Sequence, residues 1–441
     1  MRAKSWSRRI SDPPITMAGL PPLTLKTTNT WGLLVKQGLI MISAVQTRIY
    51  KYAVLALLYL GWCISYIDRA AITFAATHIA SEFHLKPSDL GLLLSSFFLG
   101  YSLLQLPGGW LADRFGSRPV IVISILMWSL FTGLTGMAWS ITSLVVIRFF
   151  FGIGEGSFPA ASIKGVAEHF DKGERPKMSS VLMSSNYIGS MLAPVIIAPL
   201  ILHFGWRNVF HYIGIVGIIF AVAYWLCVRP LSERTDGGKR PVNSKTISEL
   251  MRLPLMWQLV AVWFGLSVVN KGLDSWMPTY LMTVRGLDLK AVGLLLPLPY
   301  VMAGISTAIG GWLMMRFFNG RERVMLVVSS ALTAIFVYFM YVASDVTGVI
   351  IFQCLAYFFK SFVLAACFAL PTKILDTRLI GSSVGMVNLG GQAAGFISPL
   401  VIGILVSAFS NYDYAFAFLI SAAIFSVVVS FFIRTEKSQP I

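Results

Sequence analysis

Charged residues are scarce in this sequence. Asp, Glu, Lys and Arg make up only 12% of its 441 residues, whereas soluble globular proteins carry about 25%. Hydrophobic residues account for 56% of the chain, and its mean hydropathy is +0.75. This composition excludes an ordinary soluble enzyme or binding domain. It indicates a chain that lies mostly within a lipid bilayer.

Cysteine and histidine are also rare, with four and five residues. All four cysteines fall in or at the edge of apolar runs, where cysteine acts as a small buried hydrophobe; they are Cys63, Cys227, Cys354 and Cys367. None has the spacing of a metal site, and the histidines form no catalytic or metal-binding motif. We therefore expect no metal, no cofactor and no enzymatic activity.

Basic residues exceed acidic ones, which gives a formal net charge of +16. Such an excess can indicate a nucleic-acid partner when it clusters on a polar domain. Here the basic residues stand between apolar runs instead. We expect no nucleic-acid partner.

Long apolar runs dominate the rest of the sequence. A helix needs about 20 mostly apolar residues to span a bilayer, and twelve stretches meet that length: 52–75, 89–111, 119–138, 141–163, 178–202, 209–228, 257–281, 291–315, 324–342, 347–371, 381–408 and 413–433. A polar stretch, Arg229–Arg252, separates the first six from the last six. The sequence predicts an all-α membrane protein of twelve transmembrane helices in two six-helix halves.

These runs divide the chain into five parts. They are a polar N-terminal extension that we expect to be disordered (1–50), an N-terminal half (51–228), a cytoplasmic linker (229–256), a C-terminal half (257–434) and a cytoplasmic tail (435–441). Residues 1–40 have no convincing signal-peptide pattern. We hypothesise that residues 1–40 are a disordered extension or a mis-assigned start, with Met41 as the true initiator.

The basic residues in the loops predict the orientation. Loops on the side of the two termini hold 16 Lys and Arg: Arg114, Arg118, Lys172, Arg175, Lys177, Arg229, Arg234, Lys239, Arg240, Lys245, Arg252, Arg316, Arg321, Arg323, Lys373 and Arg378. The opposite loops hold four: Lys86, Arg207, Arg285 and Lys290. Because cytoplasmic loops are enriched in Lys and Arg, both termini are predicted to be cytoplasmic.

The two halves repeat each other. The sequence "GGWLADRFGSR" (Gly108–Arg118) follows the second span, and "GGWLMMRFFNGRER" (Gly310–Arg323) follows the eighth. Similar Gly- and Pro-containing runs lie in the fifth and eleventh spans, at Ile188–Ile201 and Ala393–Val406. Parallel repeats related by a pseudo-two-fold axis, with a binding site between them, are the plan of many secondary transporters.

Seven charged residues stand out inside the predicted spans, away from the span ends: Asp68, Arg69, Arg148, Glu155, Lys271, Asp274 and Lys360. A charge at the centre of a transmembrane helix costs roughly 2.5–3.5 kcal/mol on the insertion scale. Apolar residues could replace a purely structural ion-pair network at little cost. We therefore interpret the four of them in the first and fourth spans, Asp68, Arg69, Arg148 and Glu155, as functional.

The first and fourth spans together hold two acids and two bases. Arg148 and Glu155 are seven residues apart on one helix face, too far for a direct pair, so we expect Asp68 and Arg69 to share an interior cavity with them. Arginine presents a fork of donors that matches a carboxylate, and a buried carboxyl group beside an arginine can exchange a proton near neutral pH. This set can move an organic anion together with protons.

Other polar residues allow more than one interpretation. Tyr66 lies on about the same helix face as Arg69 and can donate to substrate, as can Tyr101, although either can instead be a packing tyrosine. Lys271 and Asp274 are most simply a local ion pair. Lys360 either extends toward the membrane surface or is a second anion ligand. In the loop after the second span, Asp113 can accept a hydrogen bond from a helix N-terminus or a neighbouring arginine and latch the cytoplasmic side.

The motifs resemble a known family. "GGWLADRFGSR" resembles the loop 2–3 signature of the major facilitator superfamily. Four segments are similar to its anion:cation symporter family: "YIDRAAI", "IRFFFGIGEGSFPA", "WMPTYL" and "NLGGQAAGFISPLVIG". That family includes bacterial proton symporters for galactonate, glucarate, hexuronates, tartrate and phthalate. The resemblance covers nearly all of Lys51–Arg434.

The resemblance implies roles for individual residues. Asp68 and Glu155 would be the proton-coupling acids. Arg69 would bind the substrate carboxylate, with Tyr66, Tyr101 and Asn388 in the binding site, and Arg148 would contact substrate, pair with an acid and help gate. Asp113 and Arg114 would belong to the cytoplasmic gate. Lys271 and Lys360 lie outside the family pattern.

The sequence thus predicts a proton-coupled importer of a small organic anion, a sugar acid above all, that acts as a monomer in a bacterial inner membrane. A symporter of an aromatic or dicarboxylic acid is one alternative. A proton-coupled efflux antiporter of small compounds is another, although two arginines in the cavity argue against it. A membrane-bound sensor would need a soluble domain, and the linker is too short to be one.

Overall fold

All of the regular secondary structure in the described part of the chain is helical. The computed structural model describes residues 30–171, 173–229, 251–318, 320–374 and 377–433. The N-terminal half contains six helices: α1 (Thr30–Phe83), α2 (Pro87–Phe115), α3 (Ser117–Gly136), α4 (Ile141–Gly156), α5 (Phe158–His169) and α6 (Arg175–Cys227). The C-terminal half contains seven: α8 (Pro254–Thr283), α9 (Leu289–Leu295), α10 (Pro297–Phe317), α11 (Glu322–Val342), α12 (Val346–Ile374), α13 (Thr377–Phe409) and α14 (Asp413–Phe431).

The helix lengths are consistent with twelve membrane crossings. Ten helical segments among the described residues are long and apolar enough to span a bilayer. One of them, Lys177–Cys227, has 51 residues, which is more than twice the length that a single crossing needs. Its helix is broken at Gly205, where φ is 75° and ψ is 154°. It is therefore long enough for two crossings, and α8, which is not one of the ten, is with 30 residues long enough for a further one.

The structure describes only part of the predicted N-terminal extension and of the predicted linker. Helix α1 begins at Thr30, so residues 30–50 are helical where we expected a disordered extension. Residues Met1–Tyr50 also separate from Lys51–Ile441 as a unit of their own. The first 29 residues, most of the linker (230–250) and the C-terminal tail (434–441) lie outside the described residues.

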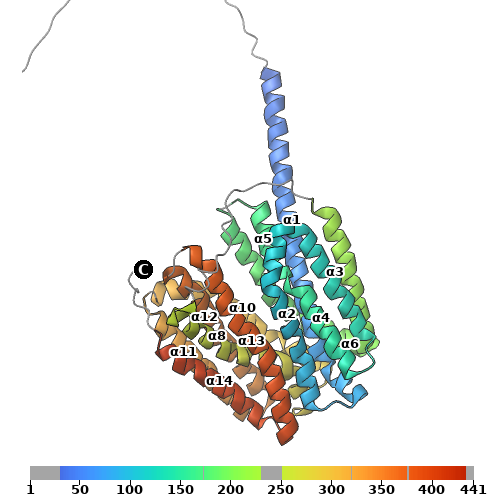
Figure 1. Ribbon diagram of the computed structural model, residues 1–441, viewed down its shortest axis with the longest axis vertical. Helices are drawn as coiled ribbons and strands as arrows, with labels where there is room; N and C mark the ends of the chain where they lie inside the picture. Colours follow the sequence, from blue (N-terminus) through green and yellow to red (C-terminus); the bar gives the residue numbers. More distant parts are fainter. Residues whose placement is uncertain (1–29, 172, 230–250, 319, 375–376, 434–441) are drawn as a thin grey trace, which may run out of the picture. The chain divides into compact units, whose positions relative to one another are not determined.

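Within Lys51–Ile441, the helices form two bundles that follow each other in the sequence (Figure 1). In the first bundle α2 packs on α4, and α3 packs on α4 and α6. In the second, α8 packs on α13 and α14, while α11 and α10 pack on α12. The bundles meet mainly along α2 and α13, with further contacts from α6 to α9 and α10. Helices α2 and α6 of the first half thus face α9, α10 and α13 of the second half.

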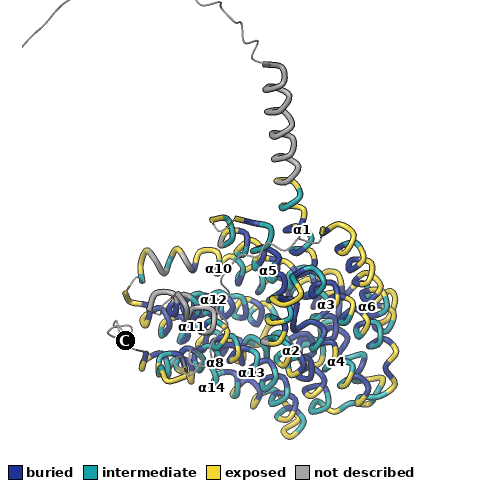
Figure 2. Tube along the Cα trace, turned by 45° about the horizontal axis from the view of Figure 1, so that its top comes forward, coloured by how far each residue is buried: buried dark blue, intermediate teal, exposed yellow. Residues whose placement is uncertain are grey.

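Large apolar side chains cover the outer surface of the bundles. Trp139, Leu226 and Ile219 are 78%, 75% and 63% exposed, and Figure 2 shows exposed turns around the outside with buried turns within. An aqueous surface would favour polar side chains at these positions. These apolar side chains fit the acyl chains of a bilayer. The helices also suit that environment, because their backbone hydrogen bonds are formed within each helix.

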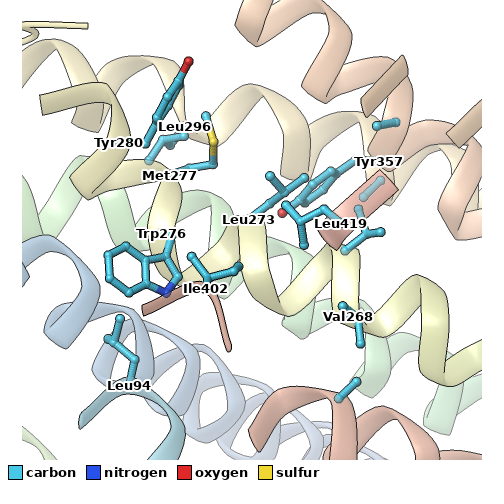
Figure 3. Close-up of a cluster of buried hydrophobic side chains, with 14 of the residues drawn as sticks. Leu94, Val268, Leu273, Trp276, Met277, Tyr280, Leu296, Tyr357, Ile402 and Leu419 are labelled. Atoms are coloured by element: carbon cyan, nitrogen blue, oxygen red, sulfur yellow. The ribbon is translucent and has the colours of Figure 1, made fainter. Parts of the chain in front are cut away.

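The two halves pack closely where α2 crosses α13. A Cβ atom on Gly91 would lie 2.7 Å from the Pro399 carbonyl oxygen, and one on Gly403 would lie 2.5 Å from the Pro87 carbonyl oxygen. These glycines allow the two helix backbones to touch. Beside this crossing, Leu94 of α2 joins Trp276 and Ile402 in one apolar cluster (Figure 3).

Candidate functional site

A cavity of about 100 Å³ lies between the two halves. Its walls come from α1, α2, α4 and α6 on one side and from α8, α10 and α12 on the other. Most of the lining is apolar, but four charged side chains reach it: Arg69, Arg148, Lys271 and Asp274. A mostly apolar cavity with a few charged groups is the usual design of a small-molecule site. Three of the four charges are positive.

Arg69 and Glu155 form the ion pair at the centre of the N-terminal half. The Arg69 Nε donates to Glu155 Oε1 over 2.8 Å, and the Ser65 hydroxyl donates to the same oxygen. The Glu155 side chain is fully buried, whereas 15% of the Arg69 side chain is exposed. Arg69 therefore faces the cavity with Glu155 behind it. Glu155 Oε2 and Arg69 Nη2 have no hydrogen-bond partner in the described part of the molecule.

Three aromatic rings surround the Arg69 guanidinium. Its Cζ lies 4.9 Å from the ring centre of Tyr66, 5.1 Å from that of Phe97 and 4.7 Å from that of Tyr101. Cation–π contacts of this kind are stronger when they are desolvated. Tyr66 and Phe97 also line the cavity, whereas Tyr101 does not. Tyr101 thus contacts Arg69 rather than the cavity itself.

Asp68 lies deeper than its neighbour Arg69. Its side chain is 1% exposed, and its Oδ2 accepts a hydrogen bond of 2.5 Å from the Thr132 hydroxyl in α3. Its Oδ1 has no partner among the described atoms. The predicted shared cavity is therefore lined by the two arginines, while Asp68 and Glu155 stand behind its wall.

Arg148 lines the same cavity but makes no ion pair within 4.0 Å among the residues the structure covers. Its guanidinium packs over the rings of Phe151 and Phe210 at 4.9 and 5.1 Å. Its Nε and Nη2 have no hydrogen-bond partner there, and the residue is 1% exposed. The expected pairing of Arg148 with an acid is thus not formed in this structure. Its donors are free for a ligand.

The C-terminal half contributes a second polar cluster, centred on Asp274. Asp274 Oδ1 accepts from the hydroxyls of Tyr300 and Tyr357 at 2.9 and 2.6 Å, and Oδ2 accepts from Asn270 Nδ2 at 2.7 Å. The local ion pair expected between Lys271 and Asp274 is absent from the ion pairs of the described residues. Asp274 instead accepts hydrogen bonds from three neutral donors, Asn270, Tyr300 and Tyr357.

The sequence analysis missed Asn270, Tyr300 and Tyr357. Asn270 stands four residues before Asp274 and therefore on the same helix face, which was a usable signal. The two tyrosines come from α10 and α12, so only the tertiary structure brings them to Asp274. Lys360 donates to Asn270 Oδ1 and lies 4.7 Å from the Tyr357 ring centre. Lys360 is 7% exposed and does not line the cavity.

Two further predicted site residues lie away from the cavity. Asn388 on α13 is half-buried and is not among the lining residues. Asp113, at the end of α2, is exposed and lies 3.5 Å from the Lys164 amino group of α5. The neighbouring Arg114 packs over the rings of Trp110 and Phe115. Lys164, which belongs to the same half, is thus one partner of Asp113 that the sequence analysis did not name.

No group of three or more His, Cys, Asp or Glu side chains in the described ranges could hold a metal ion. The chemistry of the cavity is that of a binding site. It offers fixed cations, hydroxyl donors and an apolar wall, and two carboxyl groups lie directly behind the cations.

Comparison with known proteins identifies relatives along most of the chain. The family described as Major Facilitator Superfamily matches residues 58–320 and 287–441. The chain is 32% identical to the probable sulfoacetate transporter of Cupriavidus necator over 86% of this chain and 92% of that protein. It is 27% identical to the hexuronate transporter of Bacillus subtilis (88% and 96% covered). Identity to a probable galactarate/D-glucarate transporter of Escherichia coli is 28% (87% and 94% covered).

Solved structures with the same fold are also transporters. A bacterial homologue of the human lysosomal transporter Spinster, in an inward-facing and unoccupied conformation, gives a TM-score of 0.76 at 21% identity, with 89% of this chain and 99% of the other covered. The D-xylose-proton symporter gives a TM-score of 0.70 at 16% identity, with 89% and 100% covered. These identities support the fold alone.

Proposed function

Because the chain belongs to the Major Facilitator Superfamily, we propose that it imports a small organic anion together with protons by alternating access. Membership of this family makes the chain a multi-pass membrane transporter and not an enzyme. Among its relatives are a hexuronate transporter, a probable sulfoacetate transporter and a probable galactarate/D-glucarate transporter, which supports an organic anion as the substrate. Within that class we propose a sugar acid: an aldonate, an aldarate or a hexuronate.

The charge of the cavity carries this proposal. Arg69, Arg148 and Lys271 line it, and Asp274 is the only carboxylate among the lining residues that the structure describes. Cations inside a membrane protein are costly unless a counter-charge reaches them. An organic anion supplies that counter-charge, and the planar forks of Arg69 and Arg148 suit a carboxylate. An exporter of cations would place the opposite charge here.

The Arg69–Glu155 pair offers a direct link between proton and anion. In this structure Glu155 holds the Arg69 Nε at 2.8 Å. A proton on Glu155 would remove the charge that holds Arg69, and the guanidinium would then be available to an anion in the cavity. Proton and anion would bind best in the same state. Such positive coupling between two ligands is what symport requires.

Asp68 fits a second proton-carrying role. It lies one residue from Arg69 and is held by Thr132 at 2.5 Å, with its other oxygen unpartnered among the described atoms. Arg148, whose donors are free, lines the cavity on the same half. We assign Asp68 and Glu155 to proton coupling and Arg69, Arg148 and Tyr66 to the anion.

Uptake of labelled glucarate and galactonate into right-side-out membrane vesicles tests the proposal. We expect accumulation when the outside is more acidic than the inside, and loss of accumulation when a protonophore removes the gradient. A sodium gradient alone should not replace the proton gradient. Uptake that ignores the pH gradient would contradict proton coupling, and accumulation only in inside-out vesicles would contradict import.

Two substitutions separate binding from coupling. Arg69→Ala should lower anion uptake at least about tenfold, since one charge-assisted hydrogen bond contributes about 1.5–3 kcal/mol. Glu155→Gln should retain exchange of labelled for unlabelled anion but lose accumulation driven by the pH gradient. Arg323→Ala, at an exposed position of α11, is the matched control and should behave as wild type. Normal uptake by Arg69→Ala would contradict the assignment of Arg69 to the substrate.

A further inference from the structure

We propose that the transported anion is a dianion, a small molecule with two separate anionic groups, and that Lys271 binds the second group. This inference rests on the function proposed above and adds a substrate class and a specificity-determining residue to it. The first anionic group would lie at Arg69 and Arg148 in the N-terminal half. The second would lie at Lys271 in the C-terminal half, so that the substrate bridges the two halves.

Lys271 is a cation whose charge is not neutralised locally. It lines the cavity, and no carboxylate lies within 4.0 Å of its amino group in the described part of the chain. The nearest acid in the sequence, Asp274, is already bound by Tyr300, Tyr357 and Asn270. With its oxygens engaged by these donors, Asp274 forms no ion pair with Lys271 within 4.0 Å. The lysine therefore remains available to an anion in the cavity.

Arg148 is the corresponding unpaired cation in the other half. It is 1% exposed, lines the cavity, and has two guanidinium nitrogens without a hydrogen-bond partner among the described atoms. A buried polar group without a partner is costly. Each half thus presents a cavity-lining cation, Arg148 or Lys271, without an ion-pair partner among the described residues, and a ligand with one anionic group could satisfy only one of them well.

Neighbouring aromatic rings of α2 hold cations from both halves. Arg69 packs on the Phe97 ring at 5.1 Å, and the Lys271 amino group lies 5.1 Å from the centre of the Phe98 ring. The two ring centres are 4.9 Å apart. The cations from opposite halves are therefore held by two rings in edge-to-face contact, so both face the same part of α2.

The balance of charged side chains inside the spans favours a substrate with two negative charges. Four cations lie inside the described spans (Arg69, Arg148, Lys271 and Lys360), and three carboxyl groups lie among them (Asp68, Glu155 and Asp274). One proton on a carboxyl group raises the excess to two positive charges. A dianion that enters with one proton, carried by either Asp68 or Glu155, would then neutralise the interior, whereas a monoanion would leave one charge uncompensated in a medium of low dielectric constant.

Lys360 cannot take the same role as Lys271. Its amino group donates to Asn270 Oδ1, and the residue does not line the cavity. Through Asn270 it supports the cluster that holds Asp274. Lys360 is thus a positioning residue, and Lys271 is the one C-terminal cation of the described lining that can touch the substrate.

Matched pairs of anions test the proposal with the full chain in proteoliposomes under an inward proton gradient. Gluconate and glucarate share a carbon skeleton and differ by one carboxylate, and methanesulfonate and sulfoacetate differ in the same way. We expect uptake of the dianion to exceed that of its monoanion about tenfold or more in at least one pair, from one added charge-assisted hydrogen bond. Equal or faster uptake of both monoanions would overturn the dianion assignment.

Substitutions at Lys271 show whether the preference comes from this residue. Lys271→Met should reduce the ratio of dianion to monoanion uptake to near one, mainly through loss of dianion uptake, whereas Lys271→Arg should keep a clear preference. Lys290→Met, an exposed lysine of α9, is the control and should leave the ratio unchanged. An unchanged ratio in Lys271→Met would overturn the role of Lys271.

The outcome also separates this inference from the function it rests on. Gluconate accumulation that follows the pH gradient, with no preference for glucarate, would contradict the dianion but leave a proton-coupled anion importer in place. Absence of gradient-driven uptake for all four anions would instead count against the proposed function itself.

Discussion

At the scale of single residues, the two halves treat their buried carboxyl groups differently. Glu155 is paired with a cation, Arg69, at 2.8 Å. Among the described residues, Asp274 accepts hydrogen bonds from three neutral donors, and the neighbouring Lys271 has no ion pair within 4.0 Å. An acid that can release its arginine suits a coupling role. An acid that is held away from its lysine suits a role in keeping an anion site open.

The hydroxyl of Tyr357 gives a testable consequence of this difference. Tyr357→Phe removes one of three donors to Asp274, and we expect the freed carboxylate to turn toward Lys271 and compete with the substrate. The half-saturating concentration for anion uptake should rise, and stability should fall by about 1–3 kcal/mol. Transport kinetics and thermal unfolding of the purified protein measure the two effects.

Tyr338→Phe is the control, because Tyr338 in α11 is 50% exposed. It should leave both quantities unchanged. If Tyr357→Phe kept the wild-type half-saturating concentration, Asp274 would not be positioned by this tyrosine in the way we infer.

At the scale of helices, glycine determines how near the two halves can come. The crossing of α2 and α13 brings Gly91 and Gly403 together, and a Cβ on Gly403 would lie 2.8 Å from the Gly91 Cα. The same pair stands beside the apolar cluster of Leu94 and Trp276. The helices that enclose the cavity are thus joined through backbone contact as well as through side chains.

Gly403→Ala should therefore separate α2 from α13. Overpacking of a close contact costs about 1–3 kcal/mol, and we expect a lower unfolding temperature together with reduced uptake. Gly385→Ala lies on the same helix, where an added Cβ meets no atom within 4 Å. This control should be neutral or slightly stabilising, since alanine favours a helix over glycine. Equal effects of both substitutions would contradict a specific role of the crossing.

At the scale of the whole molecule, two of the four basic residues of the predicted outer loops, Arg207 and Arg285, hold helix ends. Arg207 donates to the carbonyls of Gly136 and Ala138, at the end of α3. Arg285 donates to the carbonyls of Ser344 and Ala343, at the end of α11. Each arginine ties one loop to another on the same side of its half and satisfies free carbonyls at a helix end.

This loop arrangement leads to a prediction of topology. A fluorescent protein fused after Ile441 should fold and fluoresce, because we expect the C-terminus in the cytoplasm. Alkaline phosphatase fused after Arg285 should be active, because that loop should face the periplasm. The reverse pair of fusions should be silent. An active phosphatase at the C-terminus would contradict the predicted orientation.

The sequence by itself determined the class of the protein. Apolar runs of about 20 residues have few alternatives to membrane-spanning helices, and the repeated Gly108–Arg118 motif and the charges of "YIDRAAI" pointed to the transporter family. Patterns of this kind can be recognised in one sequence, because each depends on residues that are close together along the chain. The helical start at Thr30 was missed, because a short amphipathic run interrupted by Lys36 carries no clear spanning signal.

Only the tertiary structure decided which charges meet. Sequence spacing excluded a pair between Arg148 and Glu155, but it could not tell that Glu155 would bind Arg69 while Arg148 stayed unpaired. It likewise suggested a pair between Lys271 and Asp274, which three donors from α8, α10 and α12 prevent. Partners across helices depend on the rotation and depth of each helix, and these are set by packing between elements far apart in the chain.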